Sequence, residues 1–118
     1  METKTKQVRA VTKYVRIPPR KARLAADLIR GLSVEDASVQ LTYSQMKGGR
    51  LLKKTLDSAV ANAETQLNIS RQKLKVIEVR VDCGPVLKRS KSKAKGGMVP
   101  LIKRTSHFTV IVAQQEGE

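Results

Sequence analysis

The sequence predicts a mixed fold of helices and strands that carries one long basic hairpin arm. Apolar residues at helical spacing mark the first half of the chain, and two strand-like stretches, 76–82 and 106–112, lie in the second half. Between them, residues 83–106 contain seven Lys or Arg and no acidic residue. The 118 residues are expected to form a single domain. Its globular part would comprise about 8–82 and 104–114, and its arm about 83–103.

The first predicted element is an edge strand over residues 8–17. Arg9 and Lys13 are opposite in phase to Ala10 and Tyr14. This alternation is typical of a strand with one solvated face, which here is basic.

A helix is predicted over residues 19–30. Pro18 and Pro19 end the strand, Pro is preorganised for a first helical turn, and Gly31 is a C-terminal stop. The predicted inward stripe is Leu24, Ala25, Leu28 and Ile29.

Another face carries Arg20, Arg23, Asp27 and Arg30. An ordinary solvated surface is the simpler interpretation, but the helix dipole disfavours cations at a helix start unless an anion binds there. The cations at this start are Arg16, Arg20, Lys21 and Arg23.

Two more helices are expected before residue 70. The first begins at Ser33 with Glu35 and Asp36 in its first turn, a capping-box-like start. Its buried residues are predicted to be Val34, Ala37 and Leu41. The second follows Tyr43 and Ser44 and runs to about Leu67. Its predicted stripe is Leu52, Leu56, Ala59, Val60, Ala63 and Leu67.

Two features of this third helix stay open at the sequence level. Either the helix starts after Gly48 and Gly49, or these glycines permit a close backbone approach. Lys47, Arg50 and Lys54 share one face by spacing. This row either contacts phosphates or is a plain solvated face.

The strand before the arm spans residues 74–82. Ile77, Val79 and Val81 are predicted to face inward, whereas Leu74 and Val76 are out of phase with them, which indicates a bulge or a start near Val76. After the arm, Phe108, Val110 and Val112 alternate with His107, Thr109 and Ile111. This second strand is predicted to pair antiparallel with the first.

The arm is expected to need a polyanionic partner. Ordering about twenty residues costs on the order of 1–2 kcal/mol each, which a segment with few apolar side chains does not recover alone. The chain has a net charge of +14, and nucleic acid is the leading candidate for the partner, ahead of an anionic membrane.

Gly96 and Gly97 supply a turn near the tip, and the arm would project about 30 Å. Two Tyr and one Phe argue against base stacking, so phosphate and shape should dominate binding.

The sequence offers no basis for catalysis, a cofactor or a metal site. His107 follows Thr105 and Ser106, but no carboxylate is placed to orient it. Cys83 is the lone cysteine, so no intramolecular disulfide is possible. Without a signal peptide or a membrane span, the protein is expected in the cytoplasm.

Several stretches together resemble the large-subunit ribosomal protein 22 family. They are residues 14–24 (YVRIPPRKARL), 27–31 (DLIRG), 58–64 (SAVANAE), 84–85 followed by 87–89 (GP, LKR) and 103–110 (KRTSHFTV). They span nearly the whole chain in the family's order. The short chain is similar to the bacterial form.

The resemblance implies an α+β fold in which three helices pack on a three-stranded antiparallel sheet with a long extended hairpin. It also implies binding to 23S ribosomal RNA, neighbouring large-subunit proteins and, transiently, the nascent polypeptide at the exit-tunnel wall. No membrane contact and no homo-oligomer are expected. The candidate RNA contacts are Arg9, Lys13, Arg16, Arg20, Lys21, Arg23, Arg30, Lys47, Arg50, Lys54, Lys88, Arg89, Lys91, Lys93, Lys95, Lys103, Arg104, Thr105, Ser106 and His107. The tunnel-facing tip would comprise Ser90, Ser92, Ala94, Gly96, Gly97 and Met98.

The tip departs from the family pattern. The family usually has Pro-Arg-Ala-(Lys/Arg)-Gly-Arg-Ala, whereas residues 92–98 read SKAKGGM. Loss of the Pro and of the Arg after the Gly predicts a more flexible tip, and Lys does not reproduce bidentate Arg contacts.

Two other functional classes have less support in the sequence. An architectural DNA-binding protein with basic β-arms would wedge an apolar residue or Pro from the arm tip into the minor groove. Here the expected tip is rich in Gly and Lys. A small RNA-processing enzyme would need a catalytic constellation that the sequence does not offer.

Overall fold

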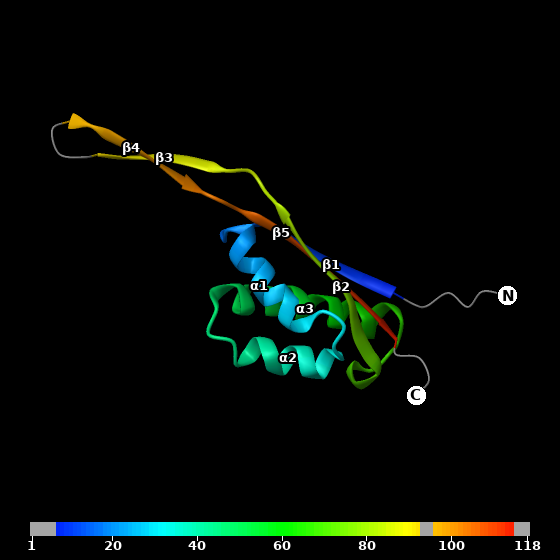
Figure 1. The fold of residues 1–118 in the computed structure, drawn as a ribbon. Coiled ribbons are helices and arrows are strands. Elements are labelled where there is room, and N and C mark those ends of the chain that lie inside the picture. The colour runs from blue at the N-terminus through cyan, green and yellow to red at the C-terminus, as the bar shows by residue number, and fades with distance from the viewer. Residues whose placement is uncertain (1–6, 93–95, 115–118) are drawn as a thin grey trace.

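A computed structural model of the protein describes residues 7–92 and 96–114. One strand precedes three helices, and the remaining strands follow a short 3₁₀ helix, η1 (Figure 1). In order, the elements are β1 (Gln7–Val15), α1 (Pro19–Ile29), α2 (Val34–Thr42), α3 (Lys47–Gln66), η1 (Arg71–Lys73), β2 (Leu74–Cys83), β3 (Leu87–Ser92), β4 (Met98–Lys103) and β5 (Ser106–Gln114).

The body is an antiparallel sheet of order β1-β5-β2, and the three helices cover one of its faces (Figure 1). Strand β5 lies in the centre, so β2 and β1 are both edge strands. Phe108, Val110 and Val112 of β5 are fully buried against the helices, as their alternation predicted. This arrangement confirms the predicted α+β class and the pairing of β5 with β2.

Strand β1 matches its prediction at one end only. Ala10 is buried and Arg9 and Lys13 are exposed. The ladder with β5 is irregular between Thr12 and Val15, and Tyr14 has a φ of 60°, in the left-handed region. Its side chain is 64% exposed, so the expectation that Tyr14 shares the inward phase of Ala10 was wrong.

Helix α1 begins at Pro19 as predicted and ends at Ile29, one residue before the predicted end, but its buried face differs from the prediction. The expected stripe was wrong at Leu24 and Leu28, which are 58% and 41% exposed. The buried residues are instead mostly small: Pro19, Ala22, Ala25, Ala26 and Ile29. Small side chains on this face let α1 lie close to its neighbours.

The glycines of α3 explain this close packing. The helix starts at Lys47, so both Gly48 and Gly49 lie in its first turn. A Cβ added at Gly48 would come within 3.3 Å of the Ala22 Cα and 3.2 Å of the Ile17 Cδ1. The second alternative therefore holds: the glycines are inside the helix, and Gly48 permits close approach to α1.

Helices α2 and α3 otherwise follow their predicted patterns. The Ser33 Oγ accepts a hydrogen bond of 3.3 Å from the Asp36 backbone N–H, which caps α2. The predicted buried residues of α2 are all buried, and in α3 only Leu67 is partly exposed.

A bulge in β2 resolves its mixed phase. The register with β5 shifts between Val76 and Glu78, which leaves Ile77 as the extra residue. Residues on both sides of it, Val76 and Val79, are buried, whereas Ile77 is 38% exposed. The predicted bulge is confirmed, and the inward placement of Ile77 was wrong because the extra residue reverses the phase.

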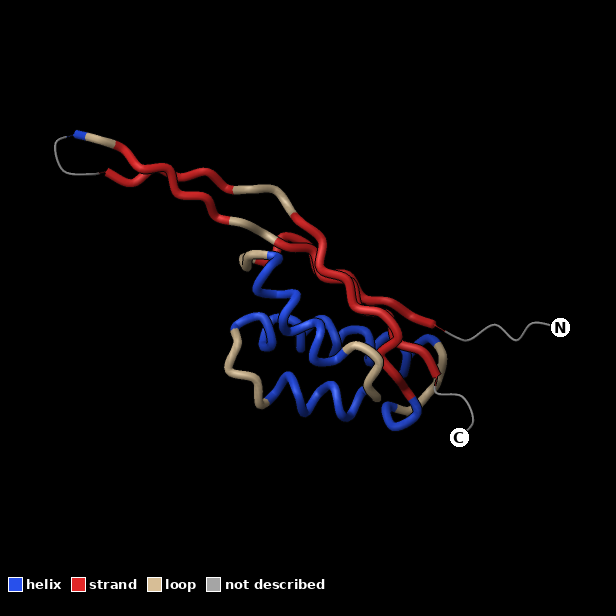
Figure 2. Tube along the Cα trace, in the orientation of Figure 1, coloured by secondary structure: helices blue, strands red, loops and turns tan. Residues whose placement is uncertain are grey.

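The arm is a two-stranded antiparallel ladder of β3 and β4, paired from Leu87 with Lys103 to Ser92 with Met98. It projects beyond the helices and gives the molecule extents of 69 × 29 × 22 Å (Figure 2). Gly96 has a φ of +75° in the connection between the strands, which agrees with its predicted turn role. Lys93, Ala94 and Lys95, and with them the predicted character of the tip, lie outside the described residues.

Leu56 and Leu24 differ in burial, and this difference predicts how much each one contributes to stability. Leu56 is fully buried, and Leu56→Ala should lower the free energy of unfolding by about 2–5 kcal/mol in urea titrations. Leu24→Ala removes the same atoms from an exposed site and should change it by no more than about 0.5 kcal/mol. Equal losses in the two variants would contradict the observed face of α1.

Candidate nucleic-acid interface

The arm joins the body through two short segments that we call the arm root, residues 83–86 and 104–106. The Gly84 backbone N–H donates to the Thr105 carbonyl at 2.9 Å, and the Thr105 hydroxyl donates to the Pro85 carbonyl at 2.6 Å. The Ser106 hydroxyl donates to the Ile17 carbonyl at 2.6 Å. These bonds link both sides of the root to each other and to the segment before α1.

The root revises part of the expected contact surface. Thr105 and Ser106 are buried, and their hydroxyl groups bind the protein's own carbonyls. His107 is half-buried, accepts a hydrogen bond of 3.1 Å from the Tyr14 N–H at Nδ1, and meets the Tyr14 ring edge to face. The hydroxyls of Thr105 and Ser106 are turned inward, so these two side chains hold the root together. This role could not be predicted from the sequence, because the carbonyls that accept these hydrogen bonds belong to residues distant in the chain, Pro85 and Ile17.

Gly84 is required at the root for space. A Cβ built at this position would overlap the Thr105 Oγ1 and lie 3.1 Å from the His107 Cε1. The close packing of the two root segments therefore depends on a residue without a side chain.

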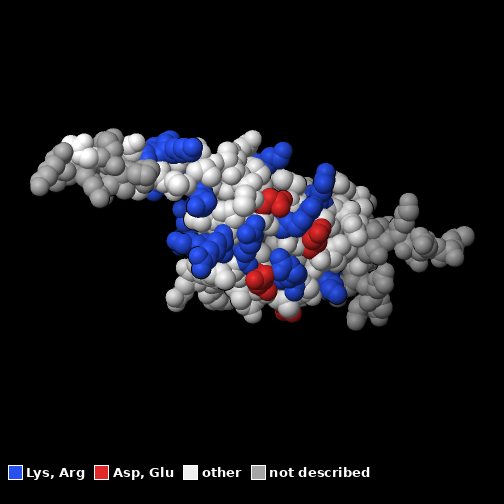
Figure 3. Space-filling model, turned by 45° about the horizontal axis from the view of Figure 1, so that its top comes forward, with Lys and Arg blue, Asp and Glu red and all other residues white. Residues whose placement is uncertain are grey.

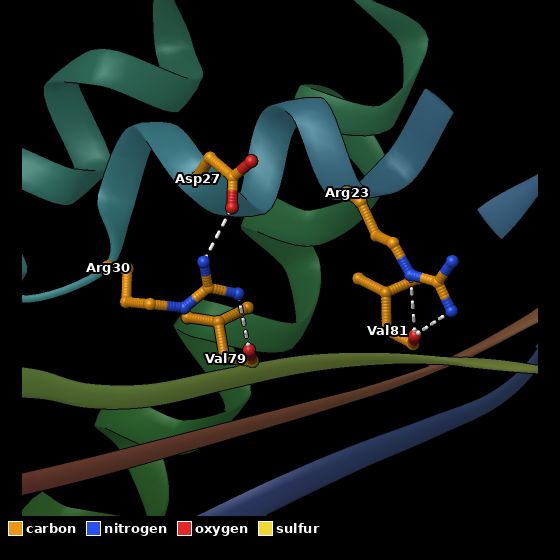
Figure 4. Close-up of polar contacts among 5 residues, drawn as sticks. All are labelled: Arg23, Asp27, Arg30, Val79 and Val81. Carbon is orange, nitrogen blue, oxygen red and sulfur yellow. Dashed lines mark hydrogen bonds and ion pairs between the residues drawn. The ribbon is translucent and has the colours of Figure 1, made fainter. Parts of the chain in front are cut away.

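Two arginines bind the edge of the sheet: Arg23 lies in α1, and Arg30 directly follows this helix (Figure 4). Arg23 donates from Nε and Nη2 to the Val81 carbonyl at 3.2 and 3.1 Å. Arg30 donates to the Val79 carbonyl at 2.9 Å and forms an ion pair with Asp27. An edge strand leaves such carbonyls without a ladder partner, and these guanidinium groups satisfy them. Arg23 and Arg30, expected as RNA contacts, thus also fasten α1 to β2.

The other predicted cations of the body are exposed. Figure 3 shows Lys and Arg gathered on the body near the place where the arm leaves it. Within the described part of the chain, none of them is joined to a carboxylate by an ion pair. They are Arg9, Lys13, Arg16, Arg20, Lys21, Lys47, Arg50 and Lys54.

The arm adds a further set of free cations. Lys88, Arg89, Lys103 and Arg104 are exposed, and the three ion pairs among the described residues all lie in the body. Lys91 lies within β3, whereas Lys93 and Lys95 belong to the part that is not described. Closely spaced cations without carboxylates create a positive surface suited to a polyanion.

Two other kinds of site are not found in the described ranges. There, no three His, Cys, Asp or Glu side chains are grouped as a metal ion would require. No helix within 7–92 and 96–114 has the length and apolar character needed to cross a bilayer.

Comparison with known proteins places the chain in one family, by a family model and by individual relatives alike. The family described as ribosomal protein L22p/L17e matches residues 10–113. The large ribosomal subunit protein uL22 of Protochlamydia amoebophila (strain UWE25) is 73% identical over 105 residues, which cover 89% of this chain and 95% of that protein. The uL22 protein of Chlamydia abortus (strain DSM 27085 / S26/3) is 63% identical over 108 residues, with coverages of 92% and 97%.

The buried hydroxyl of Ser106 provides a test of the root. Ser106→Ala leaves the Ile17 carbonyl without its partner and should cost about 1–3 kcal/mol of unfolding free energy. Ser90→Ala, the same change at an exposed arm position, should leave it within about 0.5 kcal/mol. Chemical denaturation of both variants measures the difference. A loss no larger for Ser106→Ala than for Ser90→Ala would show that this bond does not stabilise the root.

Proposed function

The chain belongs to the ribosomal protein L22p/L17e family, and from this premise we propose that it binds 23S ribosomal RNA through its arm and the cationic faces of its body. It is a ribosomal protein of the large subunit, as its curated relatives are, and this subunit lies in the cytoplasm. The family is structural rather than enzymatic, in agreement with the sequence.

The exposed arm is the observation that carries this proposal. Every arm side chain whose exposure is described, from Leu87 to Lys103, is exposed or half-buried. An isolated two-stranded hairpin is at best marginally stable in water. A binding partner therefore has to supply the missing contacts, and the arm's free cations select a polyanion. In a ribosomal protein that polyanion is ribosomal RNA.

The body would add phosphate contacts on two sides. One set surrounds the start of α1 and the exposed face of β1, and the other lies along the first turns of α3. The proposed body contacts are Arg9, Lys13, Arg16, Arg20, Lys21, Lys47, Arg50 and Lys54. Arg23 and Arg30 would use the N–H groups that remain after their bonds to β2, since a guanidinium has five.

The finer proposal places the arm tip at the exit-tunnel wall, near the nascent polypeptide, with other large-subunit proteins beside the body. About ten residues on each side at ~3.3 Å per residue give the arm a reach of about 30 Å. This reach supports penetration into folded RNA. We also propose that the body folds without the arm, because its core comes from the helices and the three-stranded sheet.

The DNA-binding alternative has less support. Architectural proteins that kink DNA insert an apolar wedge between base steps. The connection between β3 and β4 contains Gly96 and Gly97 instead, and the relatives are ribosomal proteins.

The salt dependence of RNA binding tests the arm. Arg89→Gln combined with Lys103→Gln should reduce the slope of log affinity against log salt by about 0.7–0.9 for each phosphate that the variant no longer neutralises. Filter binding to a large-subunit RNA fragment at several salt concentrations measures this slope.

A variant of equal charge serves as control. Lys73→Gln with Lys75→Gln removes two exposed cations that are outside the proposed interface. Its slope should match that of the unaltered chain. An equal change in both variants would reduce the effect to net charge and contradict a specific role of the arm.

Association with the ribosome tests the function as a whole. In a lysate kept at high magnesium, the tagged chain should sediment with the large subunit, because its family is a component of that particle. Its absence from that fraction would contradict the proposed function.

A further inference from the structure

A pocket of about 320 Å³ opens at the arm root, between α1 and the two segments that join the arm to the sheet. We infer that it takes one nucleotide of the bound RNA, with the phosphate on its arginines and the ribose or base on its apolar wall. This inference rests on the proposed function and adds a defined binding site to it. The main lining residues are Arg20 and Arg23 of α1, Cys83 and Val86 before the arm, and Arg104 after it.

Charge is the first argument for this site. Arg20, Arg23 and Arg104 come from two distant parts of the sequence, and no carboxylate lines the pocket. Within the described residues, none of the three forms an ion pair. Three arginines that line one cavity favour a phosphate, because guanidinium groups bind phosphate by paired, charge-assisted hydrogen bonds.

Arg23 is held in place before any ligand binds. Its two hydrogen bonds to the Val81 carbonyl fix the guanidinium, and its Nη2 lies 4.0 Å from the Cys83 Sγ. Those bonds leave N–H groups for an anion. A cation that is already positioned loses little conformational entropy on binding, which strengthens the contact.

The size and the wall of the pocket select a nucleotide over a bare phosphate. Its volume is near the lower end of the roughly 300–1,000 Å³ typical of small-molecule sites. Pro19 and Val86 make part of the wall apolar. Unpaired bases of RNA stack on apolar surfaces and on guanidinium planes, so a splayed-out nucleotide would cover both kinds of wall.

Occupation of this pocket would also orient the arm. The wall combines α1 with both sides of the root, so that a bound nucleotide contacts all three. The arm itself makes its regular contacts between β3 and β4. A ligand at the root is therefore placed to hold the arm in one direction relative to α1.

Cys83 provides a direct measurement of occupancy. It is the only cysteine of the chain, it is exposed and it lines the pocket. With a large-subunit RNA fragment at about ten times its dissociation constant, alkylation of the full chain by iodoacetamide should slow about tenfold. Uridine 5′-monophosphate should also slow the reaction, at a concentration at which inorganic phosphate does not. Equal protection by both would overturn the choice of a nucleotide over phosphate.

A pocket-filling variant separates insertion from simple coverage by RNA. Val86→Trp occupies the cavity without changing the protein's charge and should weaken RNA binding about tenfold. Because the displaced nucleotide takes its phosphate away from the arginines, the salt slope should fall by about 0.7–0.9. Val39→Trp places the same side chain at an exposed site on α2, outside the pocket, and should bind as the unaltered chain does. Equal binding by the two variants would overturn the inference. If Val86→Trp does not fold, the rate of Cys83 alkylation in the unaltered chain, measured with uridine 5′-monophosphate and with inorganic phosphate, decides whether the pocket takes a nucleotide.

The outcomes also distinguish this inference from the function on which it rests. RNA binding with Cys83 alkylated at the unbound rate would overturn the pocket and leave the proposed function intact. A chain that fails to bind large-subunit RNA at all would overturn both.

Discussion

The central position of β5 determines where everything else in the molecule lies. This strand pairs with β1 on one edge and β2 on the other, and its inward residues form the middle of the core. The same strand continues through Arg104 and Thr105 into β4, while β2 continues through the other side of the root into β3. The arm is thus an extension of the central strand and of the edge strand β2. It begins where the strands leave the cover of the helices.

The exposed edge of this sheet gives a structural role to the arginines in α1 and directly after it. Strand β2 has no neighbour on its outer side, and unpaired backbone groups at an edge invite pairing with another chain. Arg23 and Arg30 occupy the carbonyls of Val81 and Val79. Both arginines therefore close the sheet edge, and Arg23 in addition places positive charge at the arm root.

Local rules account for the parts of the fold that the sequence predicted. The alternation in β5, the stripe of α3 and the Ser33 cap each depend on residues close together in the chain. The buried face of α1 was mispredicted because it depends on the distance between α1 and α3, which the sequence of α1 does not contain. Gly48 allows α3 to come so close that alanines fill the interface and Leu24 stays outside.

The candidate site also has one part that the sequence predicts and one part that depends on the folded structure. The exposure of the arm cations could be predicted, since few apolar residues accompany them. The root pocket could not, because its arginines are 84 positions apart, at 20 and 104, and meet only after the sheet forms. The inward role of Ser106 was hidden for the same reason, since its partner carbonyl belongs to Ile17.

Charge on the arm and on the body has a structural consequence besides binding. Both surfaces are cationic, so their like charges disfavour contact between the arm and the body. The root hydrogen bonds set its base, and the repulsion favours an extended arm before RNA is present. The pairing of β3 with β4 still depends on RNA, because an isolated hairpin is at best marginally stable in water. An arm that is kept extended nevertheless has less conformational entropy to lose on binding than a free segment of equal length. The positive charge that attracts RNA thereby also prepares the shape that RNA binds.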